Sequence, residues 1–328
     1  MRLGLALCLV LLPLSAIAQT DDRDYLTAFL EDSLSGAGRK VTVTGFQGAL
    51  SSQASLTDLT IADDTGVWLT LHDVALDWSR SALLSGEVVV NKLTAAEIVL
   101  DRLPTNGTAT TAPEAGTFNL PDLPVSIQIG EISADHIVLG PSVLGTGLEA
   151  TLKASMSLAN GEGQASLLLQ RTDAGPAGKI ALTASYANIG QKLAIDLAAE
   201  EAAGGIASTK LNLPGAPAIS LTVEGAGPIS NFAAAVGLTT DGVDRVAGTI
   251  TLKGVSDGAT RFAADLAGDL APLFLPSYAE FFGNAVTLKA QGQHWPDGRL
   301  ALNDLAVTAK ALDLKGALTL AADGLPQR

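Results

Sequence analysis

The sequence predicts an all-β protein: an elongated antiparallel, repeating β-groove shaped like a gutter, with an N-terminal helix and one short interrupting helix. Apolar and polar residues alternate over most of the chain after residue 39. Turn-forming pairs such as Asn160-Gly161 and Asp241-Gly242 separate these stretches, at the spacing of roughly 8–12 residues expected for short strands. Aromatic residues make up only 4% of the chain, which favours many thin, repeated layers over one thick core.

The first 18 residues have the features of an export signal. Arg2 precedes an apolar run from Leu3 to Ser15, and Ala16-Ile17-Ala18 follows with the small-x-small pattern of a cleavage site. The run is shorter than the ~20 apolar residues that span a bilayer comfortably. We therefore favour a cleaved signal peptide over an uncleaved inner-membrane anchor. Both alternatives place the rest of the chain outside the cytoplasm, in the periplasm, and no later segment has a transmembrane pattern.

Residues 19–36 predict an amphipathic helix. Asp21 is a suitable N-cap and Gly36 a suitable stop. The polar face of this helix is acidic, which argues against a helix lying on a membrane surface. The apolar face has helical spacing and consists of Tyr25, Leu26, Phe29, Leu30 and Leu34.

The remaining chain divides into three parts by pattern. Residues 37–103 form a first β segment, in which the alternation slips at His72-Asp73 and predicts a bulge or a tight bend. Residues 104–122 contain mostly Thr, Ala, Gly and Pro and predict a linker. Residues 123–328 repeat strand and turn, and they are interrupted by a short helix at 276–283 whose Ser277 and Glu280 have capping-box spacing.

Composition and motifs exclude several classes of function. The formal net charge of −14 would repel a phosphate backbone, so nucleic acid is not an expected partner. The only cysteine, Cys8, lies in the leader, so no disulfide and no cysteine metal site is expected. The histidines, His72, His136 and His294, lack metal-ligand spacing. No nucleophile elbow or phosphate-binding loop is present. We expect no enzyme activity, no catalytic residues, no metal and no cofactor.

Alternation gives each strand one apolar and one polar face. The apolar face is either buried in a two-layer sandwich or lines an open trough. An aliphatic trough suits acyl chains, since each buried CH₂ group contributes ~0.8 kcal/mol. The in-phase aliphatic residues expected to line it are Val67, Leu69, Leu71, Leu167, Leu169, Ile180, Leu182, Leu193, Ile195 and Leu197.

Several stretches of the sequence, taken in order, carry a family resemblance. They are Thr44-Gly45-Phe46-Gln47-Gly48 through Asp63, Gly66-Val67-Trp68-Leu69, Val74-Ala75-Leu76-Asp77-Trp78-Ser79 with Ala82-Leu83-Leu84-Ser85-Gly86, Ile98-Val99-Leu100-Asp101-Arg102, Leu123-Pro124-Val125 through Val143-Leu144-Gly145, Glu201-Ala202-Ala203-Gly204-Gly205, Leu213-Pro214-Gly215-Ala216-Pro217, Gly225-Ala226-Gly227-Pro228-Ile229, and the 276–283 helix. Together they resemble the N-terminal part of the TamB family, the translocation and assembly module subunits related to AsmA-like proteins. The resemblance covers nearly the whole chain after the leader.

This resemblance implies a β-groove that spans the periplasm, carries phospholipid between the inner and outer membranes, and assists outer-membrane protein assembly and secretion. It also implies an inner-membrane anchor, whereas this leader has a cleavage pattern. The family's outer-membrane barrel partner, TamA, is met by a C-terminal domain that has no counterpart here. Because the chain stops directly after a strand and a turn, we expect it to be a fragment whose groove continues beyond residue 328.

Two other functions fit the same pattern. A structural or adhesive secreted β-repeat scaffold would carry no lipid, but its repeats should be near-identical, and these are irregular. An assembly factor could instead hold unfolded barrel strands at a sheet edge by β-augmentation. The groove and the edge do not exclude each other.

Overall fold

The computed structural model describes residues 27–28, 31–32, 35, 39–48, 51–105, 120, 126–255, 259–274, 276–322 and 324–327. The leader and most of the helix expected over 19–36 lie outside these residues. The parts of that helix that are described, 27–28 and 31–32, are helical.

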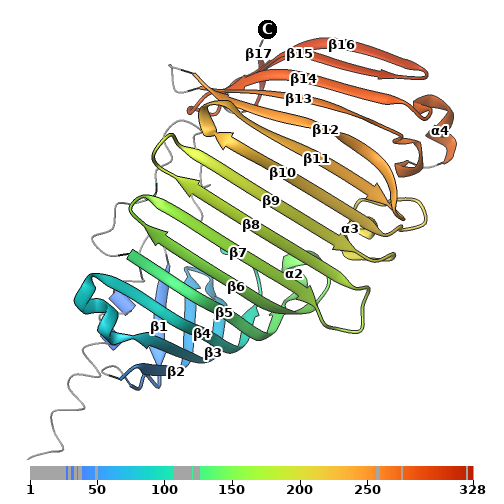
Figure 1. Ribbon diagram of the computed structural model, residues 1–328. Helices are drawn as coiled ribbons and strands as arrows, with labels where there is room; N and C mark the ends of the chain where they lie inside the picture. Colours follow the sequence, from blue (N-terminus) through green and yellow to red (C-terminus); the bar gives the residue numbers. More distant parts are fainter. Residues whose placement is uncertain are drawn as a thin grey trace, which may run out of the picture.

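The described chain is nearly all β, as the sequence predicts (Figure 1). Three short α-helices and three short 3₁₀ helices lie between its strands. The elements are β1 (Lys40–Thr44), β2 (Gln53–Asp63), β3 (Gly66–Ser79), η1 (Arg80–Ser85), β4 (Glu87–Leu100), β5 (Ser126–Leu139), α2 (Pro141–Leu144), β6 (Leu148–Ala159), β7 (Glu162–Arg171), β8 (Gly178–Ala187), β9 (Lys192–Glu201), α3 (Ile206–Lys210), β10 (Ile219–Pro228), η2 (Ile229–Asn231), β11 (Phe232–Thr240), β12 (Val243–Gly254), β13 (Thr260–Gly268), η3 (Ala271–Leu273), α4 (Pro276–Phe282), β14 (Val286–His294), β15 (Leu300–Ala309), β16 (Leu312–Leu320) and β17 (Pro326–Gln327).

All described strands belong to one sheet, in which each strand pairs with the next one along the chain. Tight hairpin turns make this order possible. Asn160 and Gly161 have φ of 51° and 70°, and Asp241 and Gly242 have φ of 50° and 74°. Asn and Asp tolerate positive φ and Gly adopts it freely, so the turn pairs identified in the sequence form tight hairpins.

One pair of strands departs from the predicted antiparallel pattern. Strands β4 and β5 run parallel, with Glu87 opposite Ser126 at one end and Leu100 opposite Leu139 at the other. The chain must therefore return along the whole length of the 14-residue β4 before β5 begins, roughly 45 Å at ~3.3 Å per residue. The expected linker over 104–122 falls in this return.

The connections lie along two opposite rims of the sheet. Helices α2, α3 and α4 follow strands that end at one rim, and η1 and η2 lie at the other (Figure 1). The short helix predicted at 276–283 is α4, and Gly283 ends it with a φ of 67°. The predicted capping box is wrong, because α4 begins at Pro276 and places Ser277 inside the helix. The Glu280 carboxylate accepts a hydrogen bond from Lys310 Nζ at 2.6 Å instead.

Strands β2 to β5 are bent by aligned bulges. The predicted slip at His72-Asp73 is confirmed, since Asp73 has a φ of 46°. The alternation of side chains between the two faces slips at the same level on the neighbouring strands. A second slip in the alternation follows on β4 and β5. Bulges bend a strand and increase its twist, so a line of them creases the sheet. The first crease runs through Thr57, Asp73, Ala96 and Asp135, and the second through Asn91 and Gly130.

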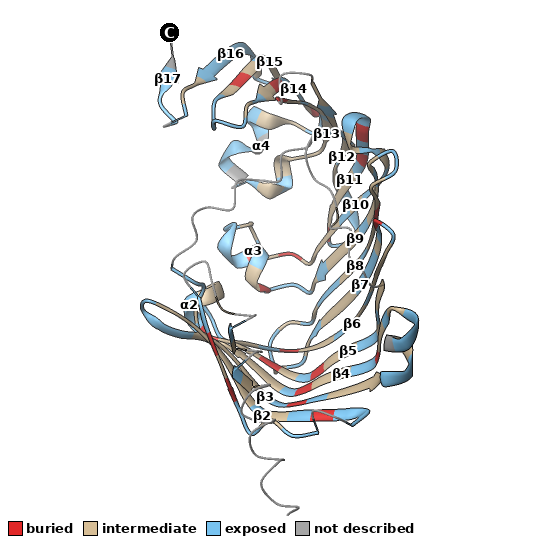
Figure 2. Cartoon of the chain, turned by 90° about the vertical axis from the view of Figure 1, so that its left-hand side faces the viewer, coloured by how far each residue is buried: buried red, intermediate tan, exposed pale blue. Residues whose placement is uncertain are grey.

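The creased sheet curls into an open C when it is seen toward the strand ends (Figure 2). Strands β2 to β5 form one arm of the C and β14 to β17 the other. The tightest packing lies at the crease, where Ala134, Ile137 and Ala150 form a buried cluster. The curvature therefore produces a trough whose best-packed part is its N-terminal arm.

Candidate functional site

Aliphatic side chains from successive strands line up on one face of the sheet. The register places Leu167 opposite Leu182, Leu182 opposite Leu197, and Leu197 opposite Val223, which lies opposite Val236. Because side chains alternate between faces along a strand, such a row stays on one side. We call this side the apolar face. Most of the buried apolar residues, such as Val74 and Tyr186, belong to it, as expected for the inside of a curved sheet.

Nine of the ten residues predicted to line a groove lie on the apolar face: Leu69, Leu71, Leu167, Leu169, Ile180, Leu182, Leu193, Ile195 and Leu197. Val67 does not follow this phase. Ile61 lies opposite Leu69, but a register shift places the next residue, Ala62, opposite Val67. Neighbouring residues such as Ile61 and Ala62 point to opposite faces, so Val67 pairs on the polar side, where it is 45% exposed.

The apolar face is open. Met156 on β6, Ile180 on β8 and Ile250 on β12 are each more than a third exposed, and Leu314 on β16 is 46% exposed. The described strands form one sheet and not two packed layers, so the trough, and not the sandwich, accommodates these side chains. Exposed, contiguous apolar surface of this kind marks binding sites in soluble proteins.

Two phenylalanine rings lie over glycines of the trough floor. A Cβ atom added to Gly225 would lie 2.8 Å from Phe232 Cζ, and one added to Gly292 would lie 2.5 Å from Phe262 Cζ. Aromatic side chains often cover glycines on neighbouring strands in this way. A side chain at either glycine would therefore displace the ring that covers it.

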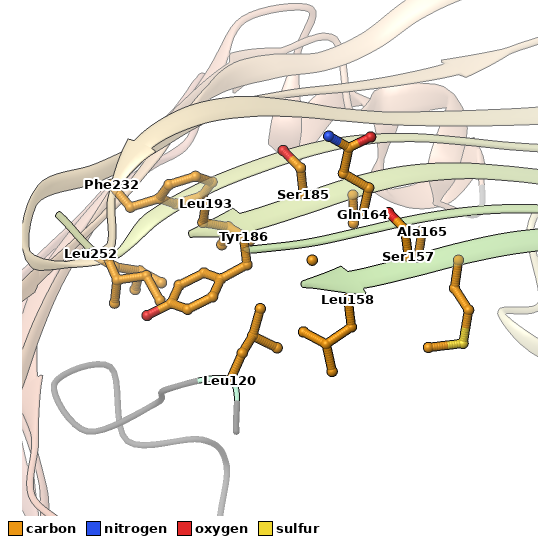
Figure 3. Close-up of a pocket in the computed structure, with 14 residues that line it drawn as sticks. Leu120, Ser157, Leu158, Gln164, Ala165, Ser185, Tyr186, Leu193, Phe232 and Leu252 are labelled. Carbon is orange, nitrogen blue, oxygen red and sulfur yellow. The ribbon is translucent and has the colours of Figure 1, made fainter. Parts of the chain in front are cut away.

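The trough deepens into a hollow of about 600 Å³ near the η2 rim (Figure 3). Tyr186, at 7% exposure, is one of its most buried side chains, and burial raises the pKa of the Tyr186 phenol. None of the described lining residues is charged. We call this space the rim hollow; its lining includes Leu120, Met156, Leu158, Ala165, Ala184, Tyr186, Leu193, Ile229, Phe232 and Leu252.

Leu120 reaches the rim hollow from the connection between β4 and β5 (Figure 3). Its backbone N–H donates to Asn188 Oδ1 at 2.8 Å, and Asn188 Nδ2 donates back to the Leu120 carbonyl at 2.8 Å. The Asn188 amide therefore pairs with both backbone polar groups of Leu120, as the backbone of a neighbouring strand would in a sheet. The pair thus holds Leu120 over the hollow as part of its wall.

The other end of the connection is held at the opposite rim by Asp63. Its carboxylate accepts hydrogen bonds from Arg102 Nη1 at 2.9 Å and Nη2 at 2.7 Å, and from the Thr105 backbone N–H at 2.9 Å. Thr65 donates to the same carboxylate. The Asp63 side chain is only 2% exposed. The Arg102 guanidinium, followed by the Thr65 hydroxyl, holds the pKa of Asp63 well below its usual range.

We expect Asp63→Asn to lower the melting temperature by several degrees at pH 7. A carboxyl with a depressed folded-state pKa contributes stability above its unfolded pKa of ~4, and loses that contribution as the pH falls through the folded value. The difference between wild type and variant should therefore be fully present at neutral pH and shrink in strong acid. Thermal unfolding followed by circular dichroism at pH 7 and at decreasing acid pH measures it.

The control for this prediction is Asp304→Asn, which changes an exposed carboxylate on β15. It should leave the melting temperature at pH 7 close to that of wild type. Equal losses in the two variants, or a gap for Asp63→Asn that does not depend on pH, would contradict the role assigned to Asp63.

The polar face brings together two of the histidines that are distant in sequence. His72 on β3 and His136 on β5 lie on either side of Glu97 on β4. Sequence spacing alone missed this arrangement, although each of these residues directly adjoins a slip in alternation. His294 lies at the end of β14 and takes no part. In the part of the chain that the structure describes, no group of three or more His, Cys, Asp or Glu side chains is suited to hold a metal ion.

Comparisons with known proteins give no identification. No protein-family model matches the chain, and no curated protein or solved structure is significantly similar to it. Among the described residues, no helix has both the length and the hydropathy needed to cross a bilayer. The chain is therefore characterised by its own geometry: a single curled sheet with an open aliphatic trough.

Proposed function

We propose that the trough binds the acyl chains of phospholipid and carries them across the periplasm between the inner and outer membranes, in support of outer-membrane protein assembly and secretion. The observation that carries this proposal is the continuous apolar face, with partly exposed aliphatic residues on strands from β6 to β16. The sequence resemblance to the TamB family points to the same function.

Hydrocarbon suits this surface better than a peptide does. The backbone N–H and C=O groups of the inner strands bond to neighbouring strands, so the trough floor presents side chains alone. An extended peptide laid on it would lose hydration of its own amide groups without finding partners, at a cost of several kcal/mol per amide in apolar surroundings. An acyl chain loses no hydrogen bonds and contributes ~0.8 kcal/mol for each buried CH₂.

The trough also offers different surroundings to the acyl chains and to the head group of a lipid. The rim hollow, at about 600 Å³, falls within the range of ~300–1,000 Å³ that is usual for small-molecule sites. Its described lining carries no charge that could pair with a phosphate. A head group would therefore stay in water at the open side of the C, while its chains lie along the sheet.

The test is to place charge on the trough floor and on the back of the same strands. Leu167→Glu with Leu182→Glu puts two carboxylates on facing positions of β7 and β8. Ser166→Glu with Thr183→Glu puts two on the next facing pair, which points to the polar face. Each protein is expressed into the periplasm and purified, and its bound phospholipid is measured by mass spectrometry per mole of protein.

We expect the wild type and the polar-face variant to carry phospholipid, and the trough variant to carry roughly tenfold less or none, because a buried charge excludes hydrocarbon. Circular dichroism must show that both variants are folded. A wild-type protein free of lipid, or a trough variant that carries as much as wild type, would contradict the proposal and favour a scaffold without lipid.

A further inference from the structure

Five titratable side chains form a continuous row across five strands on the polar face. His72 Nδ1 lies 2.6 Å from Asp58 Oδ1, and His72 Nε2 lies 4.0 Å from Glu97 Oε2. His136 Nδ1 lies 3.0 Å from Glu97 Oε1, and His136 Nε2 lies 3.2 Å from Glu149 Oε2. The row thus runs from β2 through β3, β4 and β5 to β6. We call it the imidazole row.

Each imidazole in the row stands between two carboxylates. A neutral imidazole has one N–H donor and one lone pair, so it can satisfy only one of its two neighbours. Its lone pair would face the other carboxylate. The imidazolium form donates from both nitrogens and carries the opposite charge. The geometry around His136, with both nitrogens close to carboxylate oxygens, is therefore matched to the protonated form.

The imidazole row lies along the first crease of the sheet. Asp58, His72, Glu97 and His136 each directly follow or precede a residue at which the alternation slips. The row also crosses the parallel β4–β5 pair, the junction between β1–β4 and β5–β17. Directly behind it, on the apolar face, lie Ile137 of the buried cluster and Ile98, which packs against that cluster.

A second charged row accompanies the second crease. Lys92 Nζ on β4 lies 3.1 Å from Glu131 Oε1 on β5. Lys92, and more weakly Lys153 on β6, hold the pKa of Glu131 below its usual value. This row bridges the same parallel pair, but a lysine keeps its charge from pH 5 to pH 8. The Lys92–Glu131 pair contains no histidine and therefore serves as a reference for the imidazole row.

The other groups around the imidazole row are few. On β1, Thr44 Oγ1 donates to Asp58 Oδ2 at 3.2 Å. Beyond β6, the backbone N–H of Glu149 donates to Asp173, which pairs with Arg171. The remaining charged residues on the paired strands near the crease are Asp73, Asp135, Lys92, Glu131 and Lys153.

We propose that the imidazole row is a pH-dependent clasp, which holds the crease between β1–β4 and β5–β17 firmly when His136 is charged and loosens it when His136 is neutral. Loosening would act on the trough directly, because the strands that the row joins carry Ile98 and Ile137 on their other face. The strands at the crease would then separate more readily at higher pH. This inference is independent of what the trough binds.

The direction of the pH effect follows from His136. Glu149, followed by Glu97, raises the pKa of His136 above its usual value. A raised folded-state pKa gives stability that is fully present below the unfolded pKa of ~6.5 and is lost as the pH rises through the folded value. The clasp should thus be closed in mildly acidic solution and open above neutrality.

The experiment is hydrogen exchange with mass spectrometry on the full chain at pH 5.5 and pH 8, corrected for intrinsic exchange rates. In wild type, the protection of β4 and β5 amides should fall several-fold at the higher pH, because the charged form of His136 that its two carboxylate neighbours favour is lost. Amides of β11 to β13, far from the row, serve as an internal reference and should keep their protection.

Three variants complete the test. His136→Gln should have low protection of β4 and β5 at both pH values, and Glu149→Gln should reduce the pH response while keeping the Glu97 contact. Lys92→Gln should lower protection by the same factor at both pH values. A wild-type protein without pH-dependent protection at the crease, or a His136→Gln variant that keeps the full dependence, would overturn the proposal. Unchanged protection of β11 to β13 excludes a general folding defect.

Discussion

Valine in place of Gly225 is expected to lower the free energy of unfolding by about 3 kcal/mol, at the upper end of the usual cost of overpacking. A Cβ atom at this position would lie 2.6 Å from the Ala233 carbonyl oxygen, 2.8 Å from Phe232 Cζ and 2.9 Å from Ala234 Cβ. The backbone oxygen cannot move aside without breaking the β10–β11 pairing. The Phe232 ring would also leave its place in the wall of the rim hollow.

Gly316 provides the matched control for Gly225. It occupies a position on β16 in phase with Leu314 and Leu318, and no atom lies within 4 Å of a Cβ built there. Gly316→Val should stay within about 0.5 kcal/mol of wild type or stabilise the strand slightly, because valine favours β structure. Urea denaturation followed by circular dichroism measures both variants. Similar losses for the two glycines would mean that the Phe232 contact is not responsible.

Alanine in place of Ile137 is expected to destabilise the protein by about 2–5 kcal/mol, the usual cost of removing a large buried aliphatic side chain. Ile137 is 8% exposed and packs with Ala134 and Ala150 at the crease. Larger aliphatic side chains such as Ile98 and Leu152 pack against this cluster, so the truncation also loosens their packing. The loss should appear in urea denaturation as a lower midpoint.

Val138→Ala is the control for Ile137, because it truncates the next side chain of β5, which points to the polar face and is only half-buried. It should cost clearly less than Ile137→Ala. Equal losses in the free energy of unfolding would show that the side chain at the crease is packed no more tightly than the one on the polar face.

Much of the trough could be predicted from the sequence. Strict alternation along β7 to β9 assigns Leu167, Leu182 and Leu197 to one face, because the side-chain period of a strand is two. Turn pairs such as Asn160-Gly161 mark the hairpins. The phase slip at His72-Asp73 is also visible in the sequence. These features depend on local chemistry alone, which a sequence displays directly.

The features that the sequence does not reveal depend on contacts between distant segments. Alternation predicts that Val67 lies on the apolar face, but a register shift pairs it with Ala62 on the polar side, and alternation continues on either side of the shift. The parallel β4–β5 pair has no local signature. Asn188 and Leu120 meet although they are 68 residues apart in the sequence. His72 and His136 each look like a lone surface histidine until Glu97 stands between them.

The parallel pairing of β4 and β5 also determines the order in which the chain can fold. Every other strand pair joins consecutive antiparallel strands, so pairing can begin at the connection between them; the longest of these connections separate Glu201 from Ile219 and Gly268 from Val286. Glu87 and Ser126 must meet across 39 residues. Contacts of high sequence separation form late and slowly. We therefore expect β1–β4 and β5–β17 to form first as two separate antiparallel arrays. Their docking through the parallel β4–β5 pair should be the rate-limiting step.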